Sequence, residues 1–357
     1  MKMEFNWPRS LIPFVQKLEH RGYICDLMIN SLLLINDESL ERRITRIVFD
    51  ITAGDDLVWR WEMPLSVIDA HIQIEFEVMR MSFEQRSYLM GEWLADRIGN
   101  LSASSTLPPL GQALIRRFPV RFLSVALPDH LIARCYSGMH LLGRQDIRLD
   151  CPQPDNSFLF PLSGCWQIMG NFDNTLAHRH TACREYGMDL LQLGQDGKCR
   201  KFKSESPADY HGFGAEVRSA AGGRVIQVRS DAPDTVKDRL SWISASGDDI
   251  RSVSEYSESR FGNYVLIDHE NGFWSYYCHL KQSSVQVKEG DRVKVGDSIA
   301  ELGNSGDSRI PHLHFQINDG PNPHGSRSIP IYFSNLLDME DRHMPVVTRN
   351  NSLIHTG

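Results

Sequence analysis

Two histidines separated by a single leucine, His312 and His314, are the clearest candidates for chemistry in this chain. They begin the apolar segment HLHFQIN, whose composition is typical of a β-strand. Because alternate residues of a strand point to the same face, both imidazoles can enter one cavity. The pair indicates metal binding or proton transfer, and either use needs further side chains from elsewhere in the chain.

An imidazole and a carboxylate upstream supply the missing side-chain types. His180 lies a short loop before Asp189, which stands in the apolar segment MDLLQL. A catalytic zinc ion takes three protein ligands through nitrogen or oxygen and keeps a fourth position for water. His180, Asp189 and one histidine of the 312/314 pair would provide such a set. His178 is an alternative first ligand, because either ring of the His178-x-His180 pair can face the metal.

A further histidine, His279, follows the aromatic segment WSYYC. A histidine beside a metal that is not itself a ligand is suited to donate a proton or to stabilise an oxyanion. Tyr277 lies two residues earlier and is therefore expected on the same face of the strand as His279. We expect Tyr277 to contact substrate.

In their order along the chain, these motifs resemble the lysostaphin-like zinc endopeptidases of peptidoglycan over about residues 175–335. The matching segments are His180 with Asp189, GNYVLIDH (262–269), Tyr277-Cys278-His279-Leu280, the hairpin-like VKEGDRVKVGD (287–297), Gly303-Asn304-Ser305-Gly306 and Pro311-His312-Leu313-His314-Phe315. The resemblance implies one Zn²⁺ per chain. It assigns the metal ligands to His180, Asp189 and His314, and the catalytic, non-ligand histidines to His279 and His312.

The chain departs from the common pattern of that family in two places. Many members carry the first histidine four residues before the aspartate, where this chain has Glu185, so Glu185 is a second alternative ligand. An insertion of roughly twenty residues follows Asp189, and a loop at that place can border a substrate groove. Tyr210 in the insertion and Asn304 in the Gly-Asn-Ser-Gly motif are the other two expected substrate contacts.

The function that the resemblance implies is hydrolysis of peptide bonds in bacterial peptidoglycan by metal-activated water. Two alternatives stay open. One is a non-catalytic, peptidoglycan-binding or regulatory module of the same fold, since the family includes members that have lost their ligands. The other is a zinc hydrolase with a substrate outside the cell wall. The ligand content of this chain favours the enzyme.

The pattern of the whole chain predicts a mainly β protein with some α-structure. Short apolar runs from Cys25 to about Val78, HIQIEFEV (71–78) among them, predict strands, and residues 82–99 predict a helix. We therefore expect a β-rich α+β domain of unknown role over residues 1–155. An antiparallel β-sheet metallopeptidase domain should follow over 156–345, with a tail at 346–357.

Composition limits the partners and the compartment. A net charge of −7 and the lack of a long basic cluster argue against nucleic acid as a partner. No apolar run approaches a membrane span or a secretory signal, and the seven scattered cysteines favour reduced thiols. We expect a soluble protein made in the cytoplasm, without a signal peptide, that reaches peptidoglycan by a non-standard route. Such a route leaves room for a secretion-machinery or inhibitor partner.

Overall fold

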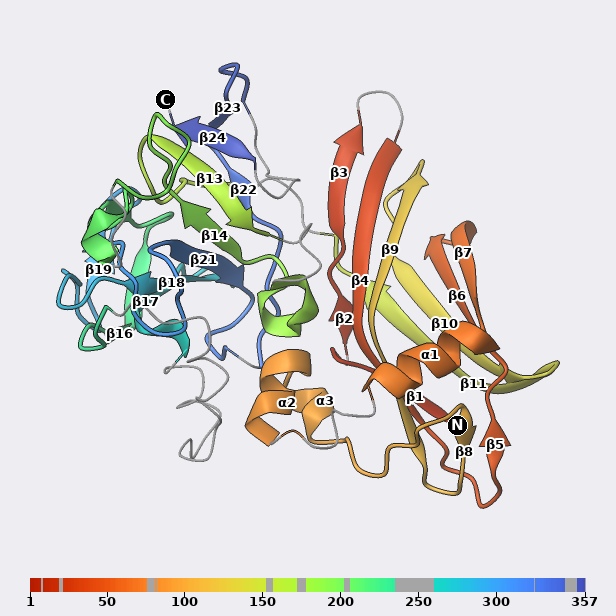
Figure 1. Ribbon diagram of the computed structural model, residues 1–357. Helices are drawn as coiled ribbons and strands as arrows, with labels where there is room; N and C mark the ends of the chain where they lie inside the picture. The colour runs from red at the N-terminus through yellow and green to blue at the C-terminus, as the bar shows by residue number, and fades with distance from the viewer. Residues whose placement is uncertain are drawn as a thin grey trace. The chain divides into compact units, whose positions relative to one another are not determined.

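The computed structural model describes residues 1–7, 9–18, 22–75, 81, 83–151, 157–171, 178–201, 206–234, 260–323, 325–343 and 352–356. For a few of these residues, His180 among them, only the backbone is described. The chain divides into two compact units, Met1–Gln153 and Pro154–Gly357, which we call unit 1 and unit 2. Both are built mainly from β-strands, as the sequence predicts (Figure 1).

Unit 1 contains an antiparallel sheet centred on one long strand, β4 (Gly22–Ile35). β4 pairs with β9 (Gln112–Ser124) along most of its length, and with β1 (Lys2–Phe5) and β3 (Phe14–Leu18). Residues 25–34 of β4 are all buried. A strand covered on both faces favours a largely apolar run, and in LMINSLLLI only Asn30 and Ser31 are polar.

A second sheet of unit 1 has the order β2-β11-β10-β6-β7. Its strands are β2 (Ser10–Leu11), β6 (Arg46–Ala53), β7 (Asp56–Pro64), β10 (His130–Ser137) and β11 (His140–Leu149). The two sheets meet through stacked rings, because Phe118 of β9 lies 4.2 Å from Trp61 and 5.7 Å from Phe49, measured between ring centroids. β5 (Arg42–Arg43) and β8 (Thr106–Leu107) form a small separate ribbon.

The described part of unit 1 also contains three helices: α1 (Leu65–Glu75), α2 (Phe83–Met90) and α3 (Glu92–Ala95). The strand expected at 71–78 is wrong for residues 71–75, which belong to α1; residues 76–78 lie outside the described part. Ile68 and Ile72 are both buried, one helical turn apart, which is the spacing of a helix that covers a core. The helix expected over 82–99 is divided at Gly91, whose φ of 84° is not helical.

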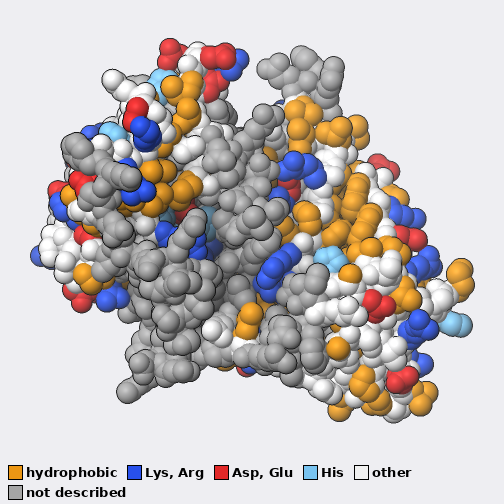
Figure 2. Space-filling view, in the orientation of Figure 1, with side chains coloured by type: hydrophobic (Ala, Val, Ile, Leu, Met, Phe, Trp, Pro, Cys, Tyr) orange, Lys and Arg blue, Asp and Glu red, His pale blue; other side chains and the backbone are white. Residues whose placement is uncertain are grey.

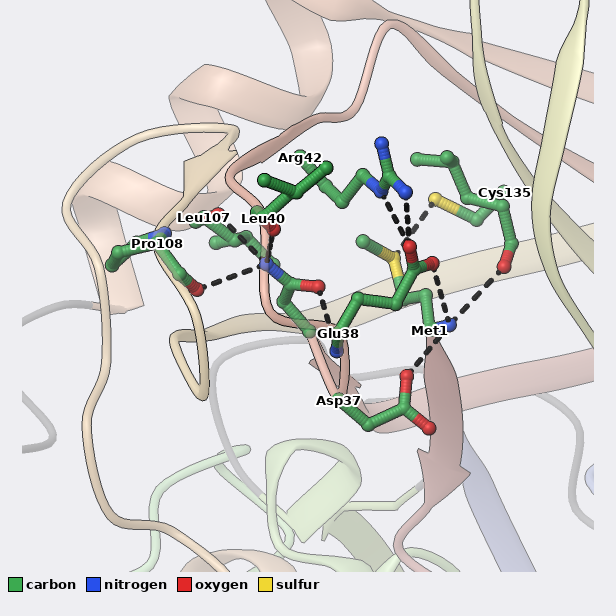
Figure 3. Close-up of polar contacts among 10 residues, drawn as sticks. Met1, Asp37, Glu38, Leu40, Arg42, Leu107, Pro108 and Cys135 are labelled. Carbon is green, nitrogen blue, oxygen red and sulfur yellow. Dashed lines mark hydrogen bonds and ion pairs between the residues drawn. The ribbon is translucent and has the colours of Figure 1, made fainter.

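Polar contacts hold in place the segment that follows β4, which begins at Asn36 (Figure 3). The α-amino nitrogen of Met1 lies 2.8 Å from Asp37 Oδ1 and donates a hydrogen bond of 3.2 Å to the Leu142 carbonyl. Asn36 is buried and donates from Nδ2 to the carbonyls of Leu107 and Pro108, each over 3.0 Å. Asn36 and Asp37, which follow β4, therefore contact the end of β8 and the start of the chain.

Unit 2 is organised by a nine-stranded antiparallel sheet of order β19-β16-β17-β18-β21-β14-β13-β24-β23 (Figure 1). The strands are β13 (Cys165–Gly170), β14 (Met188–Leu191), β16 (Gly223–Arg229), β17 (Asn263–Asp268), β18 (Trp274–Leu280), β19 (Arg292–Val293), β21 (Leu313–Asn318), β23 (Leu336–Asp338) and β24 (Leu353–Thr356). The antiparallel sheet expected for the second half of the chain is confirmed. β18, β21 and β14 are neighbours, so they bring three separate sequence motifs side by side.

Smaller elements border this sheet. β15 (Glu216–Arg218) pairs with β20 (Ser298–Glu301), and β12 (Ser157–Phe158) pairs in parallel with β22 (Tyr332–Phe333). Three short 3₁₀ helices are η2 (His178–His180), η3 (Ala182–Arg184) and η4 (Pro207–Asp209). The last residues, expected as a tail, instead form β24 inside the sheet, because Ile354 is fully buried there.

Among the described residues, none of the helices combines the length and the apolar character that crossing a lipid bilayer requires. Figure 2 shows hydrophobic side chains over the strands of unit 1. Leu57, Leu123 and Val125 are among the large apolar side chains that are exposed there.

Candidate metal centre

Strand pairing brings Asp189 and His314 together. They are register partners on β14 and β21, so their side chains emerge on the same face of the sheet. Asp189 Oδ1 lies 3.0 Å from His314 Nδ1, and Asp189 Oδ2 lies 2.8 Å from Nε2 of His178 in η2. One donor atom from each of these three residues lies within 4.8 Å of the other two. Two imidazoles and a carboxylate are a ligand set that zinc accepts.

The protonation states of these residues suit a cation. Burial lowers the pKa of His314 to about 4, so its ring is neutral near pH 7. Burial opposes ionisation of Asp189, but the rings of His178 and His312 hold its pKa well below the ordinary value. Metal ligands must be deprotonated, and these two groups already are.

A line of buried amides fixes which nitrogen of His314 faces Asp189. Nε2 of His314 donates to Gln316 Oε1 over 2.8 Å, and Gln316 Nε2 donates to Asn318 Oδ1 over 2.8 Å. With its proton on Nε2, His314 presents the lone pair of Nδ1 toward a carboxylate oxygen 3.0 Å away. Two acceptors at that distance repel each other unless a proton or a metal ion lies between them, and this buried, deprotonated pair fits a metal ion.

Glycines make room for the cluster. A Cβ at Gly187 would lie 2.9 Å from Cε1 of His314, and one at Gly170 would lie 3.0 Å from Oδ2 of Asp189. The first distance is shorter than real Cβ contacts, so any side chain at position 187 would displace the His314 ring.

His279 reaches the cluster through a break in strand pairing. β17 pairs Asn263 with Leu280 and Tyr264 with Cys278, so His279 is an extra residue without a partner opposite. Its φ of 61° lies in the left-handed region, which is strained for a histidine. The ring lies 6.1 Å from that of His314, and Nδ1 donates to the Ser305 carbonyl over 2.9 Å. Nε2 is therefore the nitrogen that a bound molecule can reach.

His312 lies beside His279, with 4.7 Å between the ring centroids. Its Nδ1 donates to the Ile310 carbonyl over 2.8 Å, and its Nε2 lies 3.4 Å from Asp189 Oδ1. Burial alone would lower the pKa of His312, but the Asp189 carboxylate raises it above its ordinary value. For His279, burial and the neighbouring His312 and His314 lower the pKa well below the ordinary value. The two rings therefore differ in their readiness to carry a proton.

These histidines face a cavity of about 270 Å³. Its lining includes His178, His279, His312 and His314, together with apolar and charged side chains: Met169, Arg184, Arg260, Asp307, Arg309 and Ile310. A cavity with convergent polar groups and shifted pKa values is the expected form of an active site.

Comparison with known proteins identifies the domain that holds part of this site. Residues 208–325 match the family model described as peptidase family M23. Unit 2 carries a peptidase family M23 domain. The predicted resemblance to the lysostaphin-like peptidases is thereby confirmed at the level of the family. The matched residues include His279, His312 and His314 of the M23 domain, whereas His178 and Asp189 precede them.

Curated relatives of the M23 domain cover a short part of the chain. Peptidoglycan DD-endopeptidase ShyC of Vibrio cholerae is 42% identical over 74 residues, which are 21% of this chain and 16% of that protein. The lipoprotein NlpD/LppB homolog of Pseudomonas aeruginosa is 44% identical over 57 residues, 16% of this chain and 18% of that protein. The aligned segments thus span less than a fifth of these relatives.

Two solved peptidase structures are also similar to part of this chain. The catalytic domain of lysostaphin from Staphylococcus simulans matches with a TM-score of 0.25 and 17% identity, covering 49% of this chain and 90% of that one. The M23 metalloprotease pseudoalterin matches with a TM-score of 0.27 and 17% identity, covering 46% of this chain and 70% of that one.

The expected location as a soluble cytoplasmic protein is wrong. Relatives of the M23 domain are named peptidoglycan DD-endopeptidases, a lipoprotein, and, in Histophilus somni, an outer membrane antigenic lipoprotein. Peptidoglycan and the outer membrane belong to the cell envelope, which conflicts with a cytoplasmic protein. The sequence argument failed because it relied on cysteine usage and on the first residues of the chain.

Of His180, the expected first ligand, the structure describes the backbone alone. The backbone of His180 lies in η2, but its side chain is outside the described residues. Within the described part of the chain, the group that can hold a metal contains His178 and not Glu185. His178, an alternative on sequence grounds, therefore takes the place beside Asp189 and His314.

Tyr277 does not lie with His279. Its ring is fully buried and lies 5.1 Å from Phe315, and its hydroxyl accepts a hydrogen bond of 2.7 Å from the Ala220 amide. Strand alternation would have placed Tyr277 and His279 on one face, but the bulge at His279 breaks that alternation. The geometry gives Tyr277 a packing role in the sheet.

The other two expected substrate contacts also lie outside the cavity lining. Asn304 is fully buried and accepts a hydrogen bond of 2.6 Å from Ser308, whose Oγ is 3.0 Å from His312 Nδ1. Asn304 thus supports the loop that orients His312. Tyr210 is buried, with Arg200 5.7 Å from its ring centroid.

Sequence reasoning missed the side chains that support the histidines. Gln316 and Asn318 follow His314 at intervals of two, so strand periodicity alone places all three on one face. Ser305 and Ile310 orient the two histidines through their backbone carbonyls. Every residue type has such a carbonyl, so the sequence could not have identified these two residues.

Proposed function

We propose that unit 2 is a zinc-dependent peptidase that hydrolyses peptide bonds in bacterial peptidoglycan. The observation that carries the proposal is the cluster of His178, Asp189 and His314, whose donor atoms lie within 4.8 Å of one another beside two further histidines. That arrangement favours an enzyme over a binding module.

His178, Asp189 and His314 are the proposed ligands of one Zn²⁺ per chain. The facing acceptors of Asp189 and His314, 3.0 Å apart, support this assignment. When bound, the ion would supply a Lewis acid that activates water and polarises the scissile carbonyl. Gln316 keeps the His314 ring in the tautomer that leaves Nδ1 available to the metal.

His279 and His312 are the proposed catalytic residues that do not bind metal. Both hold their Nδ1 proton on a backbone carbonyl, so both can use Nε2 toward substrate. His279, whose pKa is lowered by burial first, stays neutral and accepts a hydrogen bond from the attacking water. His312, whose Nδ1 proton is held by the Ile310 carbonyl, lies beside His279 and is the second ring that can hydrogen-bond the oxyanion or the leaving amine.

Peptidoglycan as the substrate is supported by the relatives. The matched proteins include two peptidoglycan DD-endopeptidases of Vibrio cholerae, ShyC and ShyA, with 42% and 37% identity over the aligned segments. Because those segments are a small part of each relative, the substrate of this chain is our inference.

Digestion of purified sacculi tests the proposal. The full chain is stripped of metal with a chelator, reloaded with one equivalent of Zn²⁺, and incubated with sacculi while new amino groups are counted. We expect release by the zinc-loaded protein, and little release by the stripped protein or by an Asp189→Asn variant. Bound zinc without any released amine would refute the peptidase and favour a binding module.

A further inference from the structure

His279 holds a backbone conformation that a histidine rarely adopts. Its φ is 61°, and it is the extra residue of the bulge between β17 and β18. A residue other than glycine persists in the left-handed region only where the surrounding structure fixes it there. The groups that bind the backbone next to His279 are therefore candidates for positioning its ring.

The carbonyl of Leu280, the residue after His279, accepts two hydrogen bonds from side chains. Nδ2 of Asn263 donates over 3.0 Å and Oγ of Ser305 donates over 2.7 Å, so both lone pairs of this carbonyl are used. The carbonyl of His279 itself accepts from the Gly303 amide over 3.1 Å. Asn263, Leu280 and Ser305 are fully buried, so water does not replace a bond that is lost there.

Ser305 binds both the backbone and the ring of the bulge. Its Oγ accepts from the Asn263 amide over 2.9 Å while it donates to Leu280. Its backbone carbonyl accepts from Nδ1 of His279 over 2.9 Å. One residue thus holds the chain beside His279 and also decides which nitrogen of the ring is left for a bound molecule.

Two glycines bring Asn263 and Ser305 together. Gly262 and Gly306 have φ values of 66° and 73°. A Cβ at Gly262 would lie 2.4 Å from the carbonyl carbon of Ser305, and one at Gly306 would lie 2.4 Å from the amide nitrogen of Gly262. Only glycine permits so close an approach in this conformation. Each polar residue therefore stands beside a glycine, in Gly262-Asn263 and in Ser305-Gly306.

We propose that Ser305, supported by Asn263, is a positioning residue for His279 that fixes the bulge and leaves Nε2 of the ring toward the cavity. The inference rests on the proposed function and deepens it. A positioning residue acts through His279. Its loss should therefore lower kcat with little change in KM, and should have no further effect once the His279 ring is absent.

A double-mutant cycle tests the inference in the zinc-loaded full chain. Ser305→Ala is made in the wild type and in His279→Ala, and kcat and KM are measured with a soluble cross-linked peptide fragment of peptidoglycan. Ser284→Ala is the matched control. Ser284 Oγ donates to the Lys281 carbonyl over 2.8 Å and accepts from the Glu301 amide over 3.1 Å, which is the same kind of bridge one residue further along β18.

We expect Ser305→Ala to lower kcat about 10- to 100-fold, because a misplaced catalytic group costs rate more than binding. In the His279→Ala background it should cause no further loss, and Ser284→Ala should keep kcat in both backgrounds. Asn263→Ala should act in the same direction, and it takes the place of Ser305→Ala if that variant does not fold. Equal losses in the two backgrounds, or wild-type kcat in Ser305→Ala, overturn the inference.

The position of the ring can also be measured without turnover. The rings of His279 and His312 lie 4.7 Å apart between centroids, so a full chain with isotope-labelled histidine should show a nuclear Overhauser effect between them. Ser305→Ala should lose this signal, and Ser284→Ala should keep it. That result in a protein that releases no amine from sacculi would refute the peptidase while upholding the positioning role. Amine release with the signal intact in Ser305→Ala would uphold the peptidase and overturn the inference.

Discussion

His314 donates from Nε2 to Gln316 Oε1 over 2.8 Å, and this contact turns the lone pair of its Nδ1 toward Asp189. The orientation of the His314 ring depends on both Gln316 and Asp189. Gln316 is fully buried and is itself oriented by Asn318, so the imidazole has one preferred tautomer before any metal arrives. The position two residues after the second histidine therefore belongs to the site.

A Gln316→Leu substitution should weaken zinc binding about 10- to 100-fold, because His314 loses the acceptor that fixes its tautomer. Gln316→Glu keeps an acceptor at the same place and should retain zinc affinity. Competition with a chelator of known zinc affinity measures both. Equal affinities for Gln316→Leu and the wild type would contradict the role given to Gln316.

The choice between His178 and His180 can be settled by paired alanine variants. His178 Nε2 lies 2.8 Å from Asp189 Oδ2, so His178→Ala should abolish stoichiometric zinc binding and lower amine release by at least about 1,000-fold. His180→Ala should keep one zinc per chain. The measurement is zinc content by elemental analysis after gel filtration. Zinc loss in His180→Ala alone would restore the ligand that the family pattern implies.

The non-ligand histidines should affect turnover and leave the metal in place. His279→Ala and His312→Ala each remove a group suited to proton transfer, so we expect kcat to fall about 100- to 10,000-fold. Zinc content should stay at one per chain in both variants, since neither residue belongs to the proposed ligand set. Loss of zinc from His312→Ala would show instead that this ring binds the metal.

Acid should destabilise the metal-free chain. The pKa of His314 is lowered by burial to about 4, and burial also lowers those of His279 and His269. A lowered folded pKa means that the unfolded chain binds more protons, so this stability is present above about pH 6.5 and is lost as the pH falls toward 4. His312, with a raised pKa, acts in the opposite direction.

The free energy of unfolding in chelator should therefore fall by about 2–3 kcal/mol between pH 7 and about pH 4.5. Urea titrations at a series of pH values measure it. A His314→Gln variant lacks the buried histidine whose pKa is lowered to about 4, and its stability should depend less steeply on pH. A flat profile for the wild type would contradict the buried, neutral state of His314.

Much of the site could be predicted because it rests on local patterns. The two-residue spacing of His312 and His314 predicts that both rings point to the same side. Asp189 lies opposite His314 because β14 and β21 are neighbours in the sheet. The first ligand was less certain, because His178 and His180 share the short helix η2 and spacing alone does not say which ring turns inward. The antiparallel sheet was predictable from the alternation of strands and turns.

The rest depended on geometry that the sequence does not encode locally. The bulge at His279 reverses the face on which that ring emerges, and so separates it from Tyr277. In unit 1, the alternation of isoleucines at 72 and 74 predicts a strand, whereas packing of Ile68 and Ile72 in the core makes the segment helical. Tertiary contacts decided both cases.

Zinc K-edge X-ray absorption on the reloaded full chain tests the central claim most directly. We predict one zinc per chain bound by two imidazole nitrogens and a carboxylate oxygen at about 2.0–2.2 Å, with loss of this signal in Asp189→Asn. Failure to retain zinc, or sulfur ligands at about 2.3 Å, would contradict the site formed by His178, Asp189 and His314.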